Sequence, residues 1–594
     1  MRLAKHGGRF KINKILCQAT APDTKEVKTQ HQYGGLKRIP PPKYQSGSRH
    51  GSSLLLFYGK GEHMKRMSKK VLAAALLLGL SQPFSVMAAD TDLQKKMESL
   101  EKELEALKQQ MQDTDKKVDK VEQKSLGRWL TISGDYRFRV DSLKGKIVDH
   151  ASGPVFGQTY MARLLAGDTP NVAQATAFAA SQQAGQGYKP KNDSLMTHRF
   201  GLNLKAKATK DVSVTARLLM YKTAGAQDDD AVTPGYFADR TGVFDGTLGH
   251  IPSDGRLAVD RAYATWSNIG DEPIWFSVGR RPSTGGVPTH LKENREKPDS
   301  SGTPALLVDY AFDGMTVGWA PDLEALPGAY AKICYGRGFE NGFTGKNVNN
   351  SLHDTDMLGV QIIPYDTDAL SIFFQYNRGF NIFDFPKMTS SAFGDTAPST
   401  DLGAIDWYGL NFLGKVKNIG IGNFNWFVSG AISDAQPNKN VSVAAGNLGL
   451  MNGTFLGQQD ASSFKDRTGW AVYAGGRYDI ESTGTKLGFE YNHGSKNWIT
   501  FAPSADDMWT SKVGTRGNAY EGYIIQELKL QPISSYLSKV FFKLGYQYYD
   551  FEYTGSNNWV GAPQKIADIK ASDLQLMAPV KYAQDIYATF EVHF

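Results

Sequence analysis

The last ten residues of the chain, 585–594, read DIYATFEVHF. Every second residue in this stretch is apolar, namely Ile586, Ala588, Phe590, Val592 and Phe594. Because successive side chains of a β-strand point to opposite faces, the stretch predicts a strand with one apolar and one polar face. The terminal strand of a soluble sandwich would alternate in the same way, so the alternation alone leaves the fold class open.

The same period of two returns along most of the chain. With the C-terminal strand, the other segments bring the predicted count to about sixteen: Leu130–Val140, Met196–Ala206, Val212–Met220, Ala258–Trp266, Ile274–Arg281, Met315–Ala320, Ala329–Gly336, Met357–Ile363, Leu370–Tyr376, Trp407–Leu413, Phe424–Ser429, Trp470–Asp479, Lys486–Tyr491, Ala519–Glu527 and Val540–Tyr549. A closed antiparallel barrel in a bacterial outer membrane needs an even number of strands. The sequence therefore predicts an all-β chain, a transmembrane antiparallel β-barrel over residues 126–594.

The connections between these strands alternate in length, as they do in outer-membrane barrels. Short turns are predicted at 209–211, 364–368, 417–421 and 482–485, and long polar loops at 142–194, 222–256, 282–304, 378–405, 433–468, 493–517 and 552–583. The first long loop contains an Ala-rich stretch, Val172–Gln183, that suits a helix. This helix would either fold inward and narrow the pore or lie at the surface, and the sequence leaves both open. An acidic run at 228–230 suits either a cation site or a solvated loop.

A secretion signal is predicted at residues 64–88. Lys65, Arg66, Lys69 and Lys70 precede the apolar stretch Val71–Leu80, and Val86-Met87-Ala88 suits cleavage after Ala88. Because such a signal normally begins a chain, residues 1–63 are predicted to be a disordered extension from a mis-called start; a genuine basic leader is the alternative. Residues 1–88 carry sixteen Lys+Arg and three Asp+Glu, so the mature chain has a net charge of +7 − 13 = −6. This balance does not indicate nucleic-acid binding.

Residues 89–125 predict a periplasmic coiled coil. Apolar or small residues follow a 4-3-4-3 spacing typical of a coiled-coil seam: Leu93, Met97, Leu100, Leu104, Leu107, Met111, Thr114, Val118 and Val121. The seam predicts a homo-oligomer and does not fix its subunit number, for which a trimer is one option.

The polar strand faces carry the candidate functional residues. By parity, a set of basic residues shares the face that would line the lumen: Arg137, Arg139, Arg199, Lys205, Arg217, Arg281 and Arg477. A row of guanidinium groups would attract anions, but Asp135, Asp260, Asp479 and Glu490 are equally available as ordinary partners. Aromatic residues are predicted at strand ends or on lipid-facing positions: Trp129, Tyr136, Trp266, Trp407, Trp426, Trp470, Tyr491, Tyr546 and Tyr548.

Enzyme motifs are sparse. The sequence has no H-E-x-x-H, no phosphate-binding G-x-x-x-x-G-K-[ST] and no C-x-x-C, and its cysteines are Cys17 and Cys334. We therefore predict no cofactor, no metal site and no catalysis. A barrel hydrolase with a Ser and a His on neighbouring outer faces is the enzyme alternative.

Two stretches, RFGLNLKAKATKDVSVTARLLM at 199–220 and FSVGRRPSTGG at 276–286, resemble porin-type barrels of Gram-negative bacteria, in particular a family of outer-membrane porins without assigned function. The aromatic end at Phe594 resembles the mark that the barrel-assembly machinery reads. The resemblance implies an outer-membrane protein surrounded by lipid and lipopolysaccharide, with an aqueous channel for passive diffusion of small hydrophilic solutes or ions. A barrel that sheathes a periplasmic or multihaem cytochrome partner is the alternative from another class.

Overall fold

The computed structural model describes residues 129–167, 172–181, 187–226, 252, 255–299, 302–343, 352–391, 394–455, 460–502, 506–530 and 538–594. All of them belong to one compact unit that ends at Phe594. The predicted extension at 1–63, the signal peptide with its cleavage at Ala88, the coiled coil at 89–125 and the acidic run at 228–230 lie outside these ranges.

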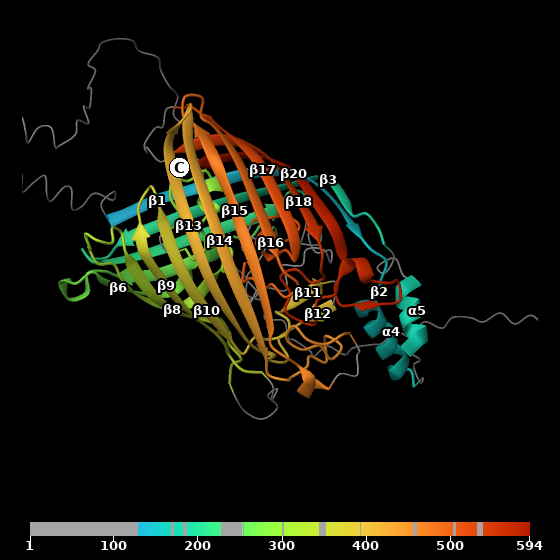
Figure 1. The fold of residues 1–594 in the computed structure, drawn as a ribbon. Coiled ribbons are helices and arrows are strands. Elements are labelled where there is room, and N and C mark those ends of the chain that lie inside the picture. The colour runs from blue at the N-terminus through green and yellow to red at the C-terminus, as the bar shows by residue number, and fades with distance from the viewer. Residues whose placement is uncertain are drawn as a thin grey trace, which may run out of the picture. The chain divides into compact units, whose positions relative to one another are not determined.

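Sixteen antiparallel strands close into a barrel (Figure 1). Their bounds are β1 Leu130–Ile147, β3 Lys191–Lys207, β4 Val212–Thr223, β5 Ala258–Trp266, β6 Ile274–Pro282, β7 Ala311–Trp319, β8 Tyr330–Phe339, β9 Thr355–Asp366, β10 Ser371–Phe380, β13 Gly403–Ile419, β14 Gly422–Pro437, β15 Arg467–Ile480, β16 Thr485–Gly494, β17 Gly517–Leu528, β18 Lys539–Phe551 and β20 Val580–His593. The predicted barrel is confirmed, and each predicted strand falls on one of these.

The barrel closes between its first and last strands. Phe138 of β1 pairs with Phe590 of β20 on one side and with His198 of β3 on the other. The remaining strands pair with their neighbours in chain order, so the structure is a simple meander. Closure of this kind leaves no strand edge with unpaired backbone groups.

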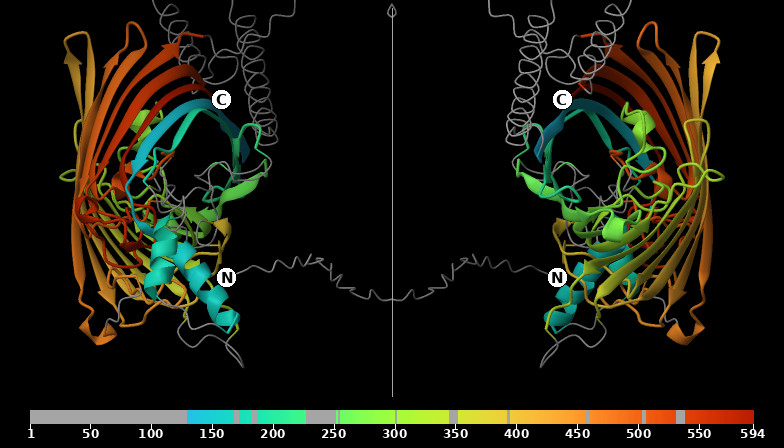
Figure 2. Two further views of the ribbon diagram at one scale, coloured as in Figure 1. Left: turned by 90° about the vertical axis from the view of Figure 1, so that its right-hand side faces the viewer. Right: turned by 90° about the vertical axis from the view of Figure 1, so that its left-hand side faces the viewer.

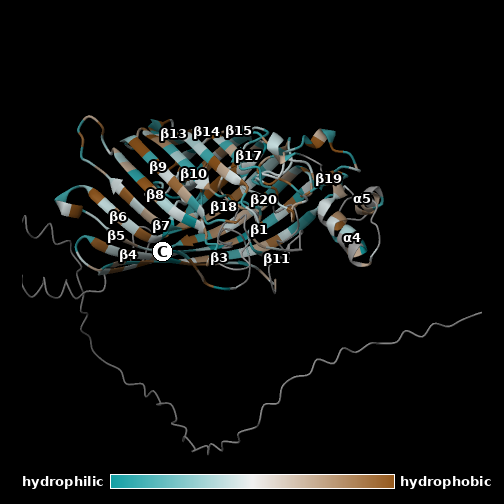
Figure 3. Ribbon diagram, turned by 90° about the horizontal axis from the view of Figure 1, so that it is seen from below, coloured by the Kyte–Doolittle hydropathy of each residue, from teal (hydrophilic) through white to brown (hydrophobic). Residues whose placement is uncertain are grey.

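Strand parity separates the two faces of the wall. On β20, Ile586 is 52% exposed on the outside, whereas Asp585 and Tyr587 on the inside are fully buried. Along the strands, hydrophobic and hydrophilic bands alternate (Figure 3). One aromatic position was predicted wrongly. Trp407, expected at the outer girdle, is 1% exposed and lies inside the barrel, because the parity of β13 places it on the same face as Ile405, where both belong to the inward-facing apolar core.

Short and long connections lie at opposite ends of the barrel. β3 and β4 are joined by residues 208–211 and β13 and β14 by 420–421, whereas 283–310 joins β6 to β7. The long-connection end carries the remaining elements: β2 Ala151–Ser152, β11 Met388–Ser391, β12 Gly394–Thr396, β19 Leu574–Gln575, α4 Gly153–Leu165, α5 Val172–Ser181, α6 Thr289–Lys292, η4 Ala461–Ser463, η5 Lys512–Gly514 and η6 Ile566–Asp568; η3 Ile269–Asp271 lies in a short connection. Within the described ranges, no helix has the length and apolar character needed to cross a membrane.

The Ala-rich stretch forms α5, as its composition indicated. α5 packs against α4 and β2, and β2 pairs with β19. Phe156, Ala175 and Ala179 form their own small core beside Phe455. The two helices stand side by side at the long-connection end (Figure 2). Of the two placements left open by the sequence, the structure therefore has the one outside the lumen.

Candidate functional site

The lumen is crossed by residues 283–299 and 302–310, which we call the first inward segment. The segment connects β6 to β7. The strands that it contacts, β15, β16 and β18, lie on the opposite side of the barrel in the closed strand order. Lys486 of β16 donates to the side chain of Asn294 at 2.6 Å, and Lys539 of β18 contacts Glu296 at 2.8 Å. Arg477 of β15 donates to the carbonyl of Leu291. The first inward segment therefore spans the barrel from wall to wall.

Glycine and leucine residues shape this segment. A Cβ on Gly286 would lie 1.8 Å from the carbonyl oxygen of Thr303, so the two limbs of the segment approach where only glycine fits. Leu306 and Leu307 then pack in the largest buried apolar cluster, together with Phe383 and Trp407. Burial of such side chains stabilises the crossing by about 2 kcal/mol each.

A second inward segment, residues 495–502 and 506–516, leaves the wall between β16 and β17. Its turn is held by Trp498, whose indole donates to the carbonyl of Val513 at 2.7 Å. Trp407 of β13 donates to the carbonyl of Ile499 at 2.8 Å. Arg516 donates to the carbonyls of Trp498 and Asn558 at 2.8 and 2.7 Å. These bonds satisfy polar groups that the apolar cluster would otherwise leave unpaired.

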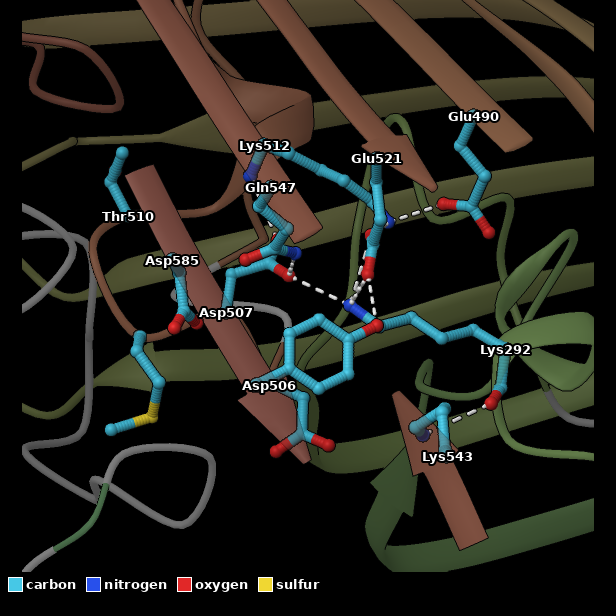
Figure 4. Close-up of polar contacts among 12 residues, drawn as sticks. Lys292, Glu490, Asp506, Asp507, Thr510, Lys512, Glu521, Lys543, Gln547 and Asp585 are labelled. Carbon is cyan, nitrogen blue, oxygen red and sulfur yellow. Dashed lines mark hydrogen bonds and ion pairs between the residues drawn. The ribbon is translucent and has the colours of Figure 1, made fainter. Parts of the chain in front are cut away.

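The two inward segments meet in a buried group of charges, shown in Figure 4, that we call the latch: Lys292, Glu490, Asp507, Lys512 and Glu521. Lys292 of the first segment lies 3.0 Å from Asp507 of the second and 2.8 Å from Glu521 of β17. Lys512 pairs with both Glu490 of β16 and Glu521. The latch therefore joins both segments to the wall through charged groups.

Neutral donors complete the latch. The hydroxyl of Tyr587 donates to Glu521 at 2.6 Å, and Gln547 donates to Asp507 at 2.6 Å. Burial acts to lower the pKa of Lys512, but Glu490 and Glu521 together raise it well above its usual value. Lys512 is therefore charged at every physiological pH. A buried charge that is fully paired is tolerated, whereas removal of one partner costs about 3–5 kcal/mol.

Next to the latch lies a row of paired arginines on β1, β3, β4 and β5, the arginine row: Arg137, Arg139, Arg199, Arg217 and Arg261. Asp506 of the second inward segment accepts from Arg137 and, at 3.2 Å, from Arg199. Burial acts to raise the pKa of Asp506, but Arg137 and Arg199 hold it well below its usual range. Asp506 thus stays ionised between two guanidinium groups.

The other members of the arginine row are also matched by carboxylates. Arg217 lies 2.7 Å from Asp135 and 3.7 Å from Asp260, and Asp260 in turn lies 3.2 Å from Arg261. Arg139 pairs with Asp141 at 2.6 Å and Asp585 at 2.8 Å. This face of the lumen is therefore a network of alternating charges and not a row of free cations.

The structure separates the seven basic residues singled out in the sequence. Arg137, Arg139, Arg199 and Arg217 come together in the arginine row, and Arg477 pairs with Asp479 at 2.6 Å beneath the first inward segment. Lys205 is exposed near the short-turn end. Arg281 is buried apart from the others, against Thr316. The latch residues Lys292, Asp507 and Lys512 were missed, since they lie in segments that the sequence indicated only as loops.

Two polar cavities lie between the first inward segment and the wall, toward the short-turn end. One, of about 450 Å³, is lined in part by Arg199, Arg217, Glu293, Asp299 and His593. The other, of about 560 Å³, is lined in part by His290, Lys297, Asp366, Asp368 and Lys415. In the part of the chain that the structure describes, no group of three or more His, Cys, Asp or Glu side chains is placed to hold a metal ion.

A family model matches residues 189–594, from just before β3 to the end of the chain. The chain belongs to the family described as protein of unknown function (DUF3373). A search of curated proteins found no match.

Solved structures with a similar fold come from several bacteria. OprB of Pseudomonas putida at high pH is 10% identical, with 79% of this chain and 95% of that chain covered and a TM-score of 0.37. The anion-selective porin from Comamonas acidovorans is 10% identical, with 78% and 99% covered and a TM-score of 0.35. The channel DcaP of Acinetobacter baumannii is 12% identical, with 78% and 96% covered and a TM-score of 0.32.

Proposed function

We propose that the protein is an outer-membrane channel of the porin type, whose lumen is narrowed by two inward segments. The closed sixteen-strand barrel, apolar outside and charged inside, is the observation that carries this proposal. The channel would pass small hydrophilic solutes or ions by diffusion through the polar cavities beside the first inward segment.

The outer face of the wall fits lipid. Large apolar side chains are exposed on many strands, among them Ile132, Val317, Phe489, Leu544 and Ile586. Soluble monomers rarely expose so extensive an apolar surface. Within lipid, where water cannot satisfy the backbone, only helices and closed barrels are stable. We therefore place the barrel in the outer membrane, with lipid and lipopolysaccharide around it.

The inner face fits a narrow channel better than a wide one. The inward segments and the apolar cluster fill much of the long-connection end, and the latch fixes both segments to the wall. The same filling works against the sheath alternative, since a cytochrome partner would need the space that these segments occupy. Assembly by the barrel machinery and association into a homo-oligomer, with a trimer as one option, belong to this proposal.

Conductance in planar bilayers tests the proposal. We expect the purified protein to give small ohmic steps, and a variant with a broken latch to give larger ones. An inactive wild type with an active latch variant would mean that the channel is closed at rest. If neither protein conducts although both are folded and inserted, the channel function is wrong.

A further inference from the structure

Arg281 of β6 differs from the members of the arginine row and from Arg516, whose guanidinium donates to three backbone carbonyls. Its side chain is 8% exposed, donates to the hydroxyl of Thr316, and lies 5.5 Å from the centres of the Tyr263 and Trp275 rings. Within the described ranges it forms no ion pair with a carboxylate, whereas every member of the arginine row does. An isolated buried charge is costly unless a counter-charge is supplied.

A cavity of about 40 Å³ lies against this guanidinium, between the first inward segment and strands β6 to β10. Its polar lining includes Ser283, Thr303, Thr316, Gln375 and Asn377. No Asp or Glu is among the described residues that line it. The cavity therefore has one permanent positive charge and no negative charge to balance it.

Among the described residues, two donors in this cavity have no hydrogen-bond partner. They are Nε of Arg281 and Nδ2 of Asn377, whose side chain is 6% exposed. The orientation of the Asn377 amide is fixed, because Gln375 Nε2 donates to its oxygen at 2.8 Å. Its nitrogen is thereby left as a donor. Oε1 of Gln375 also lacks a partner, and a water molecule that accompanies a ligand would donate to it.

We propose that this cavity binds one small monoanion, with the size of a halide, nitrate or formate. The charge on Arg281 and the free donor of Asn377 are the groups that such an anion needs. A space of 40 Å³ has room for about three water-sized groups, which excludes a sugar or a phosphorylated solute. Any part that the site takes in transport rests on the proposed channel function, but anion binding itself does not.

Crystals of the full-length mature protein grown in sodium bromide give the direct test. We expect an anomalous bromide peak within hydrogen-bond distance of Arg281 Nε and Asn377 Nδ2, and its loss in Arg281→Gln. Arg337→Gln is the matched control, because Arg337 of β8 is partly exposed and pairs with Asp354 at 2.7 Å; its crystals should keep the peak. Added formate should reduce the peak by competition.

A second variant covers the case in which Arg281→Gln does not fold. Asn377→Asp is nearly isosteric and adds a carboxylate to the lining of the cavity that Arg281 also lines, so it should abolish the bromide peak. Absence of bromide from wild-type crystals, or its persistence in Arg281→Gln or Asn377→Asp, would overturn the proposal. Because the readout is diffraction, a protein that binds bromide and does not conduct would contradict the channel function and leave the anion site intact.

Discussion

Gly134 of β1 and Phe594, the last residue of the chain, exchange two backbone hydrogen bonds, of 2.7 and 3.0 Å. A Cβ on Gly134 would lie 2.6 Å from Cζ of the Phe594 ring and 2.5 Å from the carbonyl oxygen of Gly201. The end of the chain therefore packs on the first strand at a position where that strand has no side chain. The role of Phe594 as an assembly signal stays a prediction. Variants at this seam, the contact between Gly134 and Phe594, can distinguish that role from a role in closing the barrel.

Gly134→Leu should prevent correct closure of the seam. The new side chain collides with backbone as well as with the terminal ring, so we expect loss of the compact, heat-modifiable form on electrophoresis after refolding in detergent. Gly430→Ala on β14 is the control, because a Cβ there meets nothing within 4 Å. Phe594→Ala should refold normally in detergent if the residue acts only as a signal. A normal yield of closed Gly134→Leu barrels would contradict the tight seam.

Lys292→Met should release the first inward segment. The change leaves Asp507 and Glu521 with one cation fewer, and loss of a buried partner costs about 3–5 kcal/mol. We expect a lower thermal transition and a larger single-channel conductance. Lys417→Met serves as the control, since the Lys417–Asp368 pair is exposed and contributes little. Unchanged conductance and stability in Lys292→Met would show that the latch does not hold the segment.

Asp506→Asn should make the channel prefer anions. The substitution removes the negative charge that Arg137 and Arg199 share and leaves their positive charges in the lumen. In a salt gradient the reversal potential should therefore shift toward the anion equilibrium potential. Asp313→Asn is the comparison, because Asp313 is mostly exposed and pairs only with Arg280 at 3.3 Å. Equal reversal potentials in the two variants would argue against conduction past Asp506.

His290 of the first inward segment predicts a pH effect on stability. Burial, together with Arg295 and Arg477, lowers its pKa to about 3. In the unfolded chain the imidazole takes up a proton near pH 6.5, so between pH 6.5 and 3 the unfolded state binds more protons and stability falls as the pH falls. The slope from this residue is at most about 1.4 kcal/mol per pH unit.

His290→Gln should lose that component of the slope. Unfolding in urea at pH 7.5 and pH 4.5 would measure it, with wild type and variant compared at both values. The stability of the wild type relative to the variant should be higher at pH 7.5 than at pH 4.5, by about 1–3 kcal/mol. A difference that does not change with pH would mean that the pKa of His290 is not lowered in the folded protein.

The barrel could be predicted from the sequence because the alternation of apolar and polar residues that specifies each strand is local in the chain. A period of two over eight or more residues indicates which face of a strand is apolar and which is polar. The alternation of short and long connections indicates the direction of each hairpin. The same parity was applied too simply at Trp407, which lies at a strand end where the apolar cluster begins. There the inside is as apolar as the outside, and parity of hydropathy no longer distinguishes the faces.

The site could be predicted only in part. The charges on the wall were identifiable, but not their partners, since Asp506 and Arg137 are separated by 369 residues. A signal for the inward segments was present in two apolar runs inside polar loops, Ala305–Val308 and Trp498–Phe501. Exposure of such apolar runs to water is unfavourable, so they indicate where a loop packs against another part of the protein. What each run packs against depends on the whole closed wall.

The wall-to-wall course of the first inward segment also sets an order of events during biogenesis. Residues 283–310 are synthesised well before β15–β18, the strands that receive them, and Lys292 must wait for Glu521, 229 positions later. In that interval the carbonyl of Leu306 lacks its hydrogen-bond donor, the hydroxyl of Thr500, which lies 2.6 Å away in the folded protein. We therefore expect the crossing to form only after the far half of the barrel is in place, and this step to be slow.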